Sequence, residues 1–213
     1  MPSSWQRPLL LLYGGSFDPP HWAHMRLVKH VLFLEPEYFL LMPTYIPPHK
    51  TALDVSYRHR FAMLRRGLEE AELLQKPIQL SVLEKQLGRV SYSHKTVAAL
   101  QRLCPNAQIV LLLGADSYVN FPHWANAGWL SQQVKAVVLT RETQENLLQL
   151  SNQNRPEAYF LENPVWPESS TEIRRLWAEY YTSKKPSVWQ KLLEYLPFSV
   201  CHYIISYKLY DLS

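Results

Sequence analysis

The chain has 213 residues, of which 47% are hydrophobic and 19% are charged. This length suits one medium domain or one domain with a small appendage, and this composition excludes an intrinsically disordered chain. The net charge of +4 and the isoelectric point of about 9.0 suit phosphorylated small molecules at least as well as nucleic acid, because lysine and arginine form no run.

The cysteines and the apolar segments narrow the class further. Cys104 and Cys201 lie far apart without CxxC spacing, which argues against a disulfide scaffold and against a zinc ribbon. The apolar run at 9–13 stops at Gly14 and Gly15, and it is too short for the core of a signal peptide. No stretch has the length of a membrane span, so we expect a cytoplasmic protein.

Short apolar runs alternate with helical patterns along the chain. Continuous apolar runs predict strands at 9–13, 38–42, 78–83, 109–114, 134–139 and 158–161. Helical spacing predicts helices from residue 24, over 58–74, over 93–103, from about 169 and from about 187. This alternation favours the α/β class, with a Rossmann-like doubly wound parallel sheet and a helical C-terminal tail. We expect an α/β domain over 1–186 and a helical extension of it over 187–213.

The segment GGSFDPPHWAH at 14–24 follows the first predicted strand, and ligands of such folds bind where strands end. Gly14 and Gly15 permit a sharp turn and a close backbone approach. His21 and His24 stand three residues apart at the start of a helix, so both project from one face. The free N–H groups of a helix start suit a phosphate, and two imidazoles there can donate hydrogen bonds to a phosphoryl group in transfer.

Two other interpretations fit these histidines. With Asp18 they would form part of a metal site, but no further ligand stands out, and we predict no metal held by the protein. They would otherwise be a structural pair, which an HxxH pattern alone favours. The strand, the Gly-Gly turn and the helix around them favour the phosphate interpretation.

Three later segments carry polar groups after predicted strands. Lys50 follows a rigid Pro-Pro pair and would reach phosphates or remain a solvated charge. Asp116 follows the fourth strand, where a carboxylate binds ribose hydroxyls or caps a helix. Ser169 and Glu172 form a predicted capping box, which places a second helix start near Arg174. The alternative there is an ordinary capped helix with a surface arginine.

The segment at 14–24 resembles the GGxFDPxHxGH signature of the nicotinate mononucleotide adenylyltransferases, which belong to the HxGH-motif nucleotidyltransferase superfamily. Similar segments follow in order along nearly the whole chain: TYIPPHK at 44–50, RFAM at 60–63, SYSHKT at 91–96, LLGADSYVNFPHW at 112–124, SSTEIRR at 169–175 and VCHYIISYKLY at 200–210. Arg141, which follows the fifth predicted strand, also fits the family pattern.

This resemblance implies transfer of AMP from ATP to nicotinate mononucleotide, which gives deamido-NAD and pyrophosphate in NAD biosynthesis. It implies catalytic roles for His21 and His24. The implied ATP-binding residues are Gly14, Gly15, Ser16, Phe17, His21, His24, Gly114, Asp116, Ser169, Ser170, Thr171 and Arg174. The implied mononucleotide-binding residues are Asp18, Lys50, Tyr92, Ser93, Trp124 and Arg141.

The implied partners are small molecules: ATP, which brings Mg²⁺ with it, and a pyridine mononucleotide. Neither nucleic acid nor membrane is expected as a partner, and a homo-oligomer is left open. Trp124 matches the base-stacking tryptophan of the family, although core packing is the usual fate of tryptophan.

The sequence departs from the family pattern at three positions. Ala23 replaces the glycine of HxGH, Lys95 replaces an acidic residue, and Glu168 replaces an apolar residue before SST. Lys95 would either extend into solvent, the more common role of such a lysine, or favour the nicotinate carboxylate over the uncharged amide. Two alternative functions stay open. The first is an adenylyltransferase acting on nicotinamide mononucleotide, and the second, motivated by Ala23, is a nucleotide-binding module that has lost catalysis.

Overall fold

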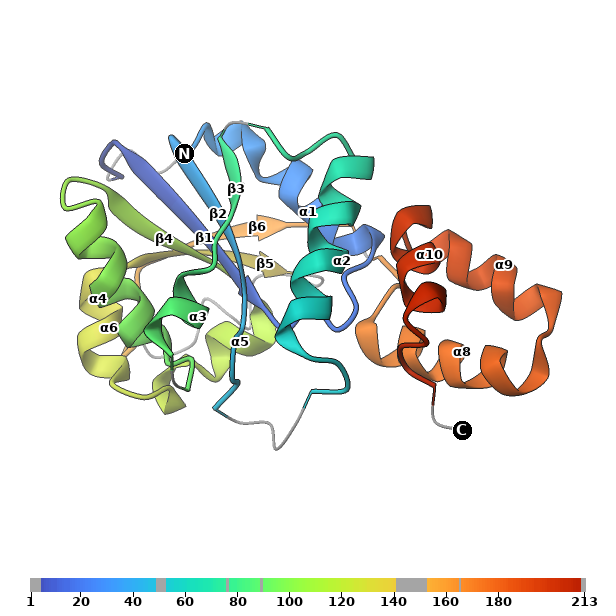
Figure 1. Ribbon diagram of the computed structural model, residues 1–213. Coiled ribbons are helices and arrows are strands. Elements are labelled where there is room, and N and C mark those ends of the chain that lie inside the picture. The colour runs from blue at the N-terminus through green and yellow to red at the C-terminus, as the bar shows by residue number, and fades with distance from the viewer. Residues whose placement is uncertain are drawn as a thin grey trace. The chain divides into compact units, whose positions relative to one another are not determined.

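The computed structural model describes residues 5–48, 53–75, 77–88, 90–140, 153–164 and 166–211 (Figure 1). The chain divides into two compact units. The first comprises Met1–Gly14, Leu32–Pro48 and Lys76–Val165, and the second comprises Gly15–Val31, His49–Gln75 and Trp166–Ser213. The boundary predicted at residue 186 stays a prediction.

A six-stranded sheet has the order β3-β2-β1-β4-β5-β6. Its strands are β1 (Leu9–Gly15), β2 (Tyr38–Pro43), β3 (Ile78–Leu80), β4 (Gln108–Gly114), β5 (Lys135–Thr140) and β6 (Ala158–Glu162). The pairs β1–β4, β2–β3, β4–β5 and β5–β6 are parallel. The order reverses between β1 and β4, and such a switch point is where open α/β sheets bind ligands.

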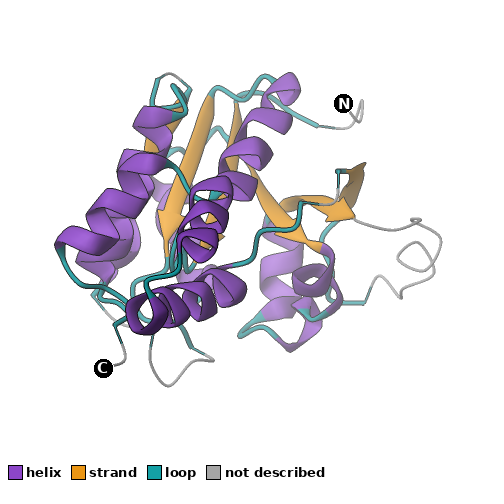
Figure 2. Cartoon of the chain, turned by 90° about the vertical axis from the view of Figure 1, so that its right-hand side faces the viewer, coloured by secondary structure: helices purple, strands orange, loops and turns teal. Residues whose placement is uncertain are grey.

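Burial on both faces explains why the central strands β1, β4 and β5 have continuous apolar sequences. Leu9, Leu10, Leu11 and Leu12 of β1 are all at most 6% exposed. All six predicted strands exist, but the third ends at Leu80 rather than at residue 83. The Ser81 hydroxyl accepts a hydrogen bond from the N–H of Leu83, where a short helix begins. The predicted α/β class, a sheet flanked by helices, is confirmed (Figure 2).

The first unit also contains α3 (Leu83–Leu87), α4 (Ser93–Leu103), α5 (Ala115–Val119) and α6 (Ala127–Gln133), with 3₁₀ turns at Leu32–Leu34 and Phe121–His123. Helix α4 has the predicted bounds, and its Val97 and Leu100 join a core cluster with Leu130 of α6. Helices α3, α5 and α6 were missed because five to seven residues are too few to display a helical period.

The second unit contains α1 (Trp22–His30), α2 (Tyr57–Glu70), α8 (Ser170–Ser183), α9 (Pro186–Tyr195) and α10 (Phe198–Ser206). Its core cluster surrounds Trp177, which is fully buried. Helix α2 ends four residues earlier than predicted, because Glu72 adopts a φ of 56° and the N–H of Leu73 donates back to the carbonyl of Leu68. No helix among the described residues is long and apolar enough to cross a membrane.

Candidate functional site

Two of the predicted site glycines lie near the carboxyl ends of the neighbouring strands β1 and β4. Gly14 follows the buried part of β1, and Gly114 ends β4 and caps α5. A Cβ atom built on either residue would meet nothing within 4 Å. The space beside both backbones is therefore open to a close approach by a ligand. Asp116 lies exposed in the first turn of α5, where its charge agrees with the helix dipole.

A histidine links the two chain segments that carry the predicted mononucleotide-binding residues Tyr92 and Trp124. The ring of His94 stacks on Tyr92 with 5.6 Å between centroids, and its Nδ1 lies 3.0 Å from the carbonyl oxygen of Ala125. Trp124, which directly precedes Ala125 in the chain, is half-buried and stacks on Phe121 with 4.9 Å between the ring centroids. One indole face therefore packs on the core. Sequence reasoning did not single out His94, because only this tertiary contact reveals its role.

Glu84 and Ser91 hold the loop after β2 against the start of α4. The N–H of Tyr45 donates to Glu84 Oε2 at 3.1 Å and to the Ser91 hydroxyl at 3.1 Å. The Thr96 hydroxyl donates to Glu84 Oε1 at 3.4 Å. Ser93 is the first residue of α4, and Tyr92 is its N-cap. These bonds fix the backbone around Tyr92 and Ser93, two of the predicted mononucleotide-binding residues.

His21 and His24 occupy the start of α1 in the second unit. His21 is the N-cap residue and is 6% exposed, and its backbone N–H donates to Nδ1 of His24 at 3.1 Å. The two ring centroids are 3.8 Å apart, and the Phe17 ring lies 5.0 Å from that of His24. Both histidines therefore project from one helix start, as predicted.

This contact fixes the protonation state of His24. A backbone N–H can only donate, so Nδ1 must accept and the ring proton must reside on Nε2. Burial lowers the pKa of His24 to about 3, which keeps the imidazole neutral near pH 7. His24 thus presents a single N–H donor at a helix start. This combination suits an anionic oxygen.

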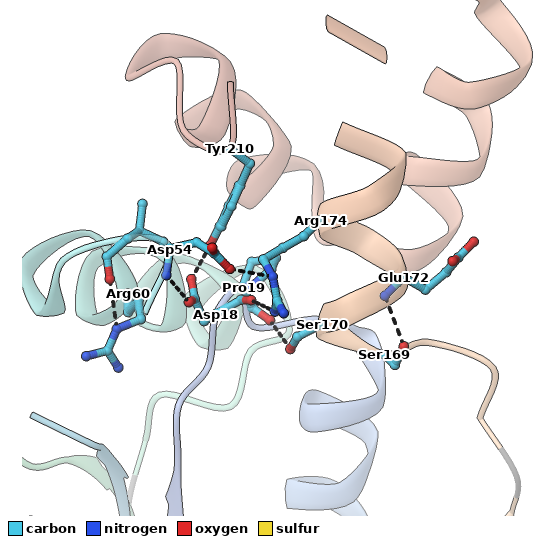
Figure 3. A network of polar contacts seen from close by, with 10 residues as sticks. Asp18, Pro19, Asp54, Arg60, Ser169, Ser170, Glu172, Arg174 and Tyr210 are labelled. Carbon is cyan, nitrogen blue, oxygen red and sulfur yellow. Dashed lines mark hydrogen bonds and ion pairs between the residues drawn. The ribbon is translucent and has the colours of Figure 1, made fainter. Parts of the chain in front are cut away.

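The loop between β1 and α1 is held by donors from the helices α2 and α8, and Figure 3 shows the two from α8. The guanidinium of Arg60, 1% exposed, donates to the carbonyl of Ser16 at 2.6 Å. The Ser170 hydroxyl donates to the carbonyl of Pro19 at 2.9 Å. Arg174 donates to the carbonyl of Asp18 at 2.8 Å. The path of this loop is set by α2 and α8 as well as by its own sequence.

The Asp18 side chain is 2% exposed, and both carboxylate oxygens accept hydrogen bonds from the protein. The N–H of Asp54 donates to Oδ2 at 3.0 Å, and the Tyr210 hydroxyl donates to Oδ1 at 2.7 Å. The mononucleotide-binding role of Asp18 stays a prediction. Neither Asp54 nor Tyr210 was singled out from the sequence, since the second lies 192 residues away.

The start of α8 has half of the predicted capping box. The hydroxyl of Ser169, the N-cap residue, accepts a hydrogen bond from the N–H of Glu172 at 3.2 Å. The Glu172 carboxylate instead pairs with Arg175 one turn later, at 2.7 Å. Thr171 is exposed, and Arg174 forms an ion pair with Asp54 at 2.6 Å. Lys50 and Arg141 lie outside the described residues.

The three departures from the family pattern have distinct surroundings. Ala23 is 8% exposed in the first turn of α1. The Lys95 ammonium lies 5.2 Å from the centroid of the Tyr92 ring. Glu168 is buried, and its carboxylate pairs with Arg26 at 2.6 Å. A buried carboxylate replaces an apolar side chain here because Arg26 compensates its charge.

Comparison with known proteins gives concordant matches. The pattern of the cytidylyltransferase-like family matches residues 12–176. A probable nicotinate-nucleotide adenylyltransferase from Gemmatimonas aurantiaca is 34% identical over 168 residues, covering 76% of this chain and 78% of that protein. The nicotinate-nucleotide adenylyltransferase of Bacillus subtilis is 30% identical over 210 residues, covering 94% of this chain and 97% of that protein.

Solved structures match the fold. The nicotinic acid mononucleotide adenylyltransferase of Plasmodium falciparum, in complex with NaAD, has a TM-score of 0.80 at 22% sequence identity. This match covers 96% of this chain and 98% of the Plasmodium chain. At this identity the likeness establishes the architecture.

Replacing Ala23 with glycine tests whether its methyl group matters to the site. We expect the free energy of unfolding to fall by about 1 kcal/mol from lost helix propensity, while turnover stays equal or rises. Urea unfolding and steady-state kinetics measure both quantities. Ala98→Gly in α4 is the matched control for propensity alone, and a collapse of turnover confined to Ala23→Gly would contradict the expectation.

The lowered pKa of His24 predicts an acid-dependent loss of stability. The unfolded chain takes up a proton near pH 6.5 but the folded chain does so only near pH 3, so stability falls as pH drops through this window. The free energy of unfolding, measured by urea titration at several pH values, should fall less in His24→Asn than in wild type. Parallel curves for the two proteins would show that His24 is not held neutral.

Proposed function

Because the chain belongs to the nicotinate-nucleotide adenylyltransferases of the cytidylyltransferase-like family, we propose that it transfers the adenylyl group of ATP to nicotinate mononucleotide. The products are deamido-NAD and pyrophosphate. The observation that carries this proposal is the paired His21 and His24 at the start of α1, with His24 held neutral and its ring proton placed on Nε2 by the hydrogen bond that Nδ1 accepts.

The reaction joins a phosphate oxygen of the mononucleotide to the α-phosphorus of ATP, and the bond from that phosphorus to the bridging oxygen of pyrophosphate breaks. The attacking phosphate is already ionised near neutral pH, so no general base is required. Catalysis then rests on positioning and on stabilisation of charge at the transferring phosphoryl group. The residues of this chain supply both.

His21 and His24 are proposed to contact the α-phosphate and its bridging oxygen. A neutral imidazole that donates from Nε2 stabilises the negative charge that builds on these oxygens, and it does not need to change its protonation state. The N–H groups at the start of α1 add to this effect. The backbone of Ser16 and Phe17 is proposed to lie along the nucleotide, since Arg60 holds this segment in place.

The start of α8 is proposed to receive the outer phosphates of ATP. Ser169, Ser170 and Thr171 stand at this helix start, and Arg174 lies one turn further. Arg174 pairs with the Asp54 carboxylate, so a phosphate would replace one anionic partner with another.

Mg²⁺ is proposed to enter with ATP. Among the described residues, no three His, Cys, Asp or Glu side chains form a group suited to hold a metal ion. Asp18 uses both carboxylate oxygens within the protein. Substrate phosphates would therefore supply the main ligands, as is common for this ion. When bound with ATP, Mg²⁺ would supply positive charge that neutralises the outgoing pyrophosphate.

The mononucleotide is proposed to use groups of the first unit. The indole of Trp124 has one face on Phe121, which leaves its other face for a pyridine ring. Backbone N–H groups near Tyr92 and Ser93 would hold the nicotinate carboxylate, and Lys95 adds positive charge beside Tyr92. Asp116, in contrast, is proposed to bind the ribose of ATP. The positive charge of Lys95 supports the acid over the amide.

A product assay separates this proposal from its alternatives. The protein is incubated with Mg²⁺, ATP and either nicotinate or nicotinamide mononucleotide, and the products are identified by mass spectrometry. We expect deamido-NAD and pyrophosphate with the acid at the higher kcat/KM. Preference for the amide would support the nicotinamide mononucleotide enzyme. ATP binding without release of pyrophosphate would support a nucleotide-binding module, which Ala23 motivates.

Removing either imidazole tests the proposed catalytic pair. We expect His21→Ala and His24→Ala to lower kcat by at least about a hundredfold, the scale of losing a transition-state donor. ATP affinity, measured by calorimetry, should fall much less. His30→Ala at the far end of the same helix is the control and should keep its turnover. A variant at position 21 or 24 with near-wild-type kcat would refute the role of that histidine.

Replacing Trp124 with alanine tests the pyridine contact. We expect the KM for the mononucleotide to rise and the KM for ATP to stay nearly unchanged, because the lost stacking is worth roughly 0.5–1.5 kcal/mol. Trp129→Ala is the matched control, since both indoles pack partly buried on the same core cluster. An effect confined to ATP, or one equal in the two variants, would place the pyridine elsewhere.

A further inference from the structure

The hydroxyl of Tyr210 meets the buried carboxylate of Asp18 within the second unit (Figure 3). The two oxygens are 2.7 Å apart, and both residues are buried, at 8% and 2% exposure. Burial beside Asp18 raises the pKa of Tyr210, so its hydroxyl keeps its proton and donates. A charge-assisted bond of this length is among the stronger hydrogen bonds of proteins.

Backbone strain occurs on both sides of this bond. Phe17, next to Asp18, has a φ of 49°, and Tyr210 itself has a φ of 62°. Neither residue is a glycine, so these left-handed conformations persist only where surrounding contacts hold them. Strain of this kind clusters at functional sites, and here it coincides with the loop that leads to His21.

We propose that Tyr210 is a positioning residue for adenylyl transfer, which acts through Asp18 to place His21 and His24 against the phosphoryl group. This inference rests on the proposed function. Asp18 lies three residues before His21, and its carboxylate joins the loop to the turn that follows α10. Loss of the Tyr210 hydroxyl leaves a buried carboxylate oxygen without its donor, and the loop then shifts to find another.

The Tyr210 contact can be separated from the other contacts on the loop. Ser170 and Arg174 also hold it, but both are proposed ATP-binding residues, so their substitution would mix two effects. Asp54 holds Asp18 through its backbone N–H, which side-chain substitution leaves in place. Tyr210 contacts Asp18 and has no proposed contact with substrate.

A shift of the loop should appear in kcat more than in KM. Misplacement of catalytic groups raises the transition state, whereas the start of α8 would still bind the outer phosphates of ATP. We expect Tyr210→Phe to lower kcat roughly ten- to a hundredfold, with KM for both substrates close to wild type. A simple loss of folded protein would instead lower the apparent enzyme concentration and leave the turnover per ATP-binding site unchanged.

Tyr207→Phe is the matched control. This substitution also removes a tyrosine hydroxyl, three residues before Tyr210. Tyr207 is 54% exposed, and its ring contacts that of Tyr203. Each variant is assayed at low temperature, and kcat is normalised to ATP-binding sites counted by calorimetry. Wild-type kcat in Tyr210→Phe overturns the proposal, and so does an equal loss in both variants. A Tyr210→Phe chain that is unfolded by circular dichroism also overturns it, because the hydroxyl would then be required for folding.

A double variant tests whether the effect passes through Asp18. If it does, Tyr210→Phe should lower kcat little further in an Asp18→Asn background, because the two substitutions break one contact. Independent, multiplying losses overturn the proposed route through Asp18.

Amide hydrogen exchange distinguishes this inference from the proposed function. We expect Tyr210→Phe to speed exchange in residues 16–24 and to leave β5 unchanged. If wild type forms no dinucleotide, the proposed function fails, and faster exchange in 16–24 would still support the positioning contact. Unchanged exchange in an active enzyme overturns the positioning contact alone.

Discussion

The burial of the Asp18 carboxylate is the constraint on which the site of the second unit depends. A carboxylate in an apolar interior is costly unless donors surround it, and here the Asp54 N–H and the Tyr210 hydroxyl fill that role. Arg174 also binds the backbone carbonyl of Asp18. The donors come from three separate stretches of chain, so one small loop links the surrounding helices. Its geometry is stable only when all of these segments are folded.

At the start of α1, one hydrogen bond both caps the helix and orients the ring of His24. A helix leaves its first N–H groups without partners, and most helices satisfy them with Ser, Thr, Asp or Asn. Here a histidine is the N-cap, and the imidazole of His24 accepts its N–H. The cap therefore also orients the ring and selects its tautomer. The hydrogen bond that satisfies the N–H of His21 also places the ring proton of His24 on Nε2, which makes Nε2 a donor.

The sequence predicted those features that depend on local pattern, and it missed those that depend on distant contacts. The strands β1, β4 and β5 follow from apolar runs because each contains at least four consecutive buried residues, and the bounds of α4 follow from helical spacing. The partners of Asp18 and the link from His94 to Ala125 carry no periodic signal, since each joins segments far apart in the chain. The capping box at Ser169 was half right, because Arg175 competes for Glu172 by charge. The roles of Lys50 and Arg141 stay predictions.

The lowered pKa of His24 also has a consequence for how adenylyl transfer would depend on pH. Since its imidazole stays neutral down to about pH 3, mild acidification of the surroundings does not switch this donor on or off. The phosphate of the incoming mononucleotide, by contrast, titrates near pH 6, as phosphate monoesters do. As the pH falls from neutral, the substrate phosphate would therefore gain a proton well before His24 does. The charge of His24 would stay constant over the range in which the charge of the substrate changes.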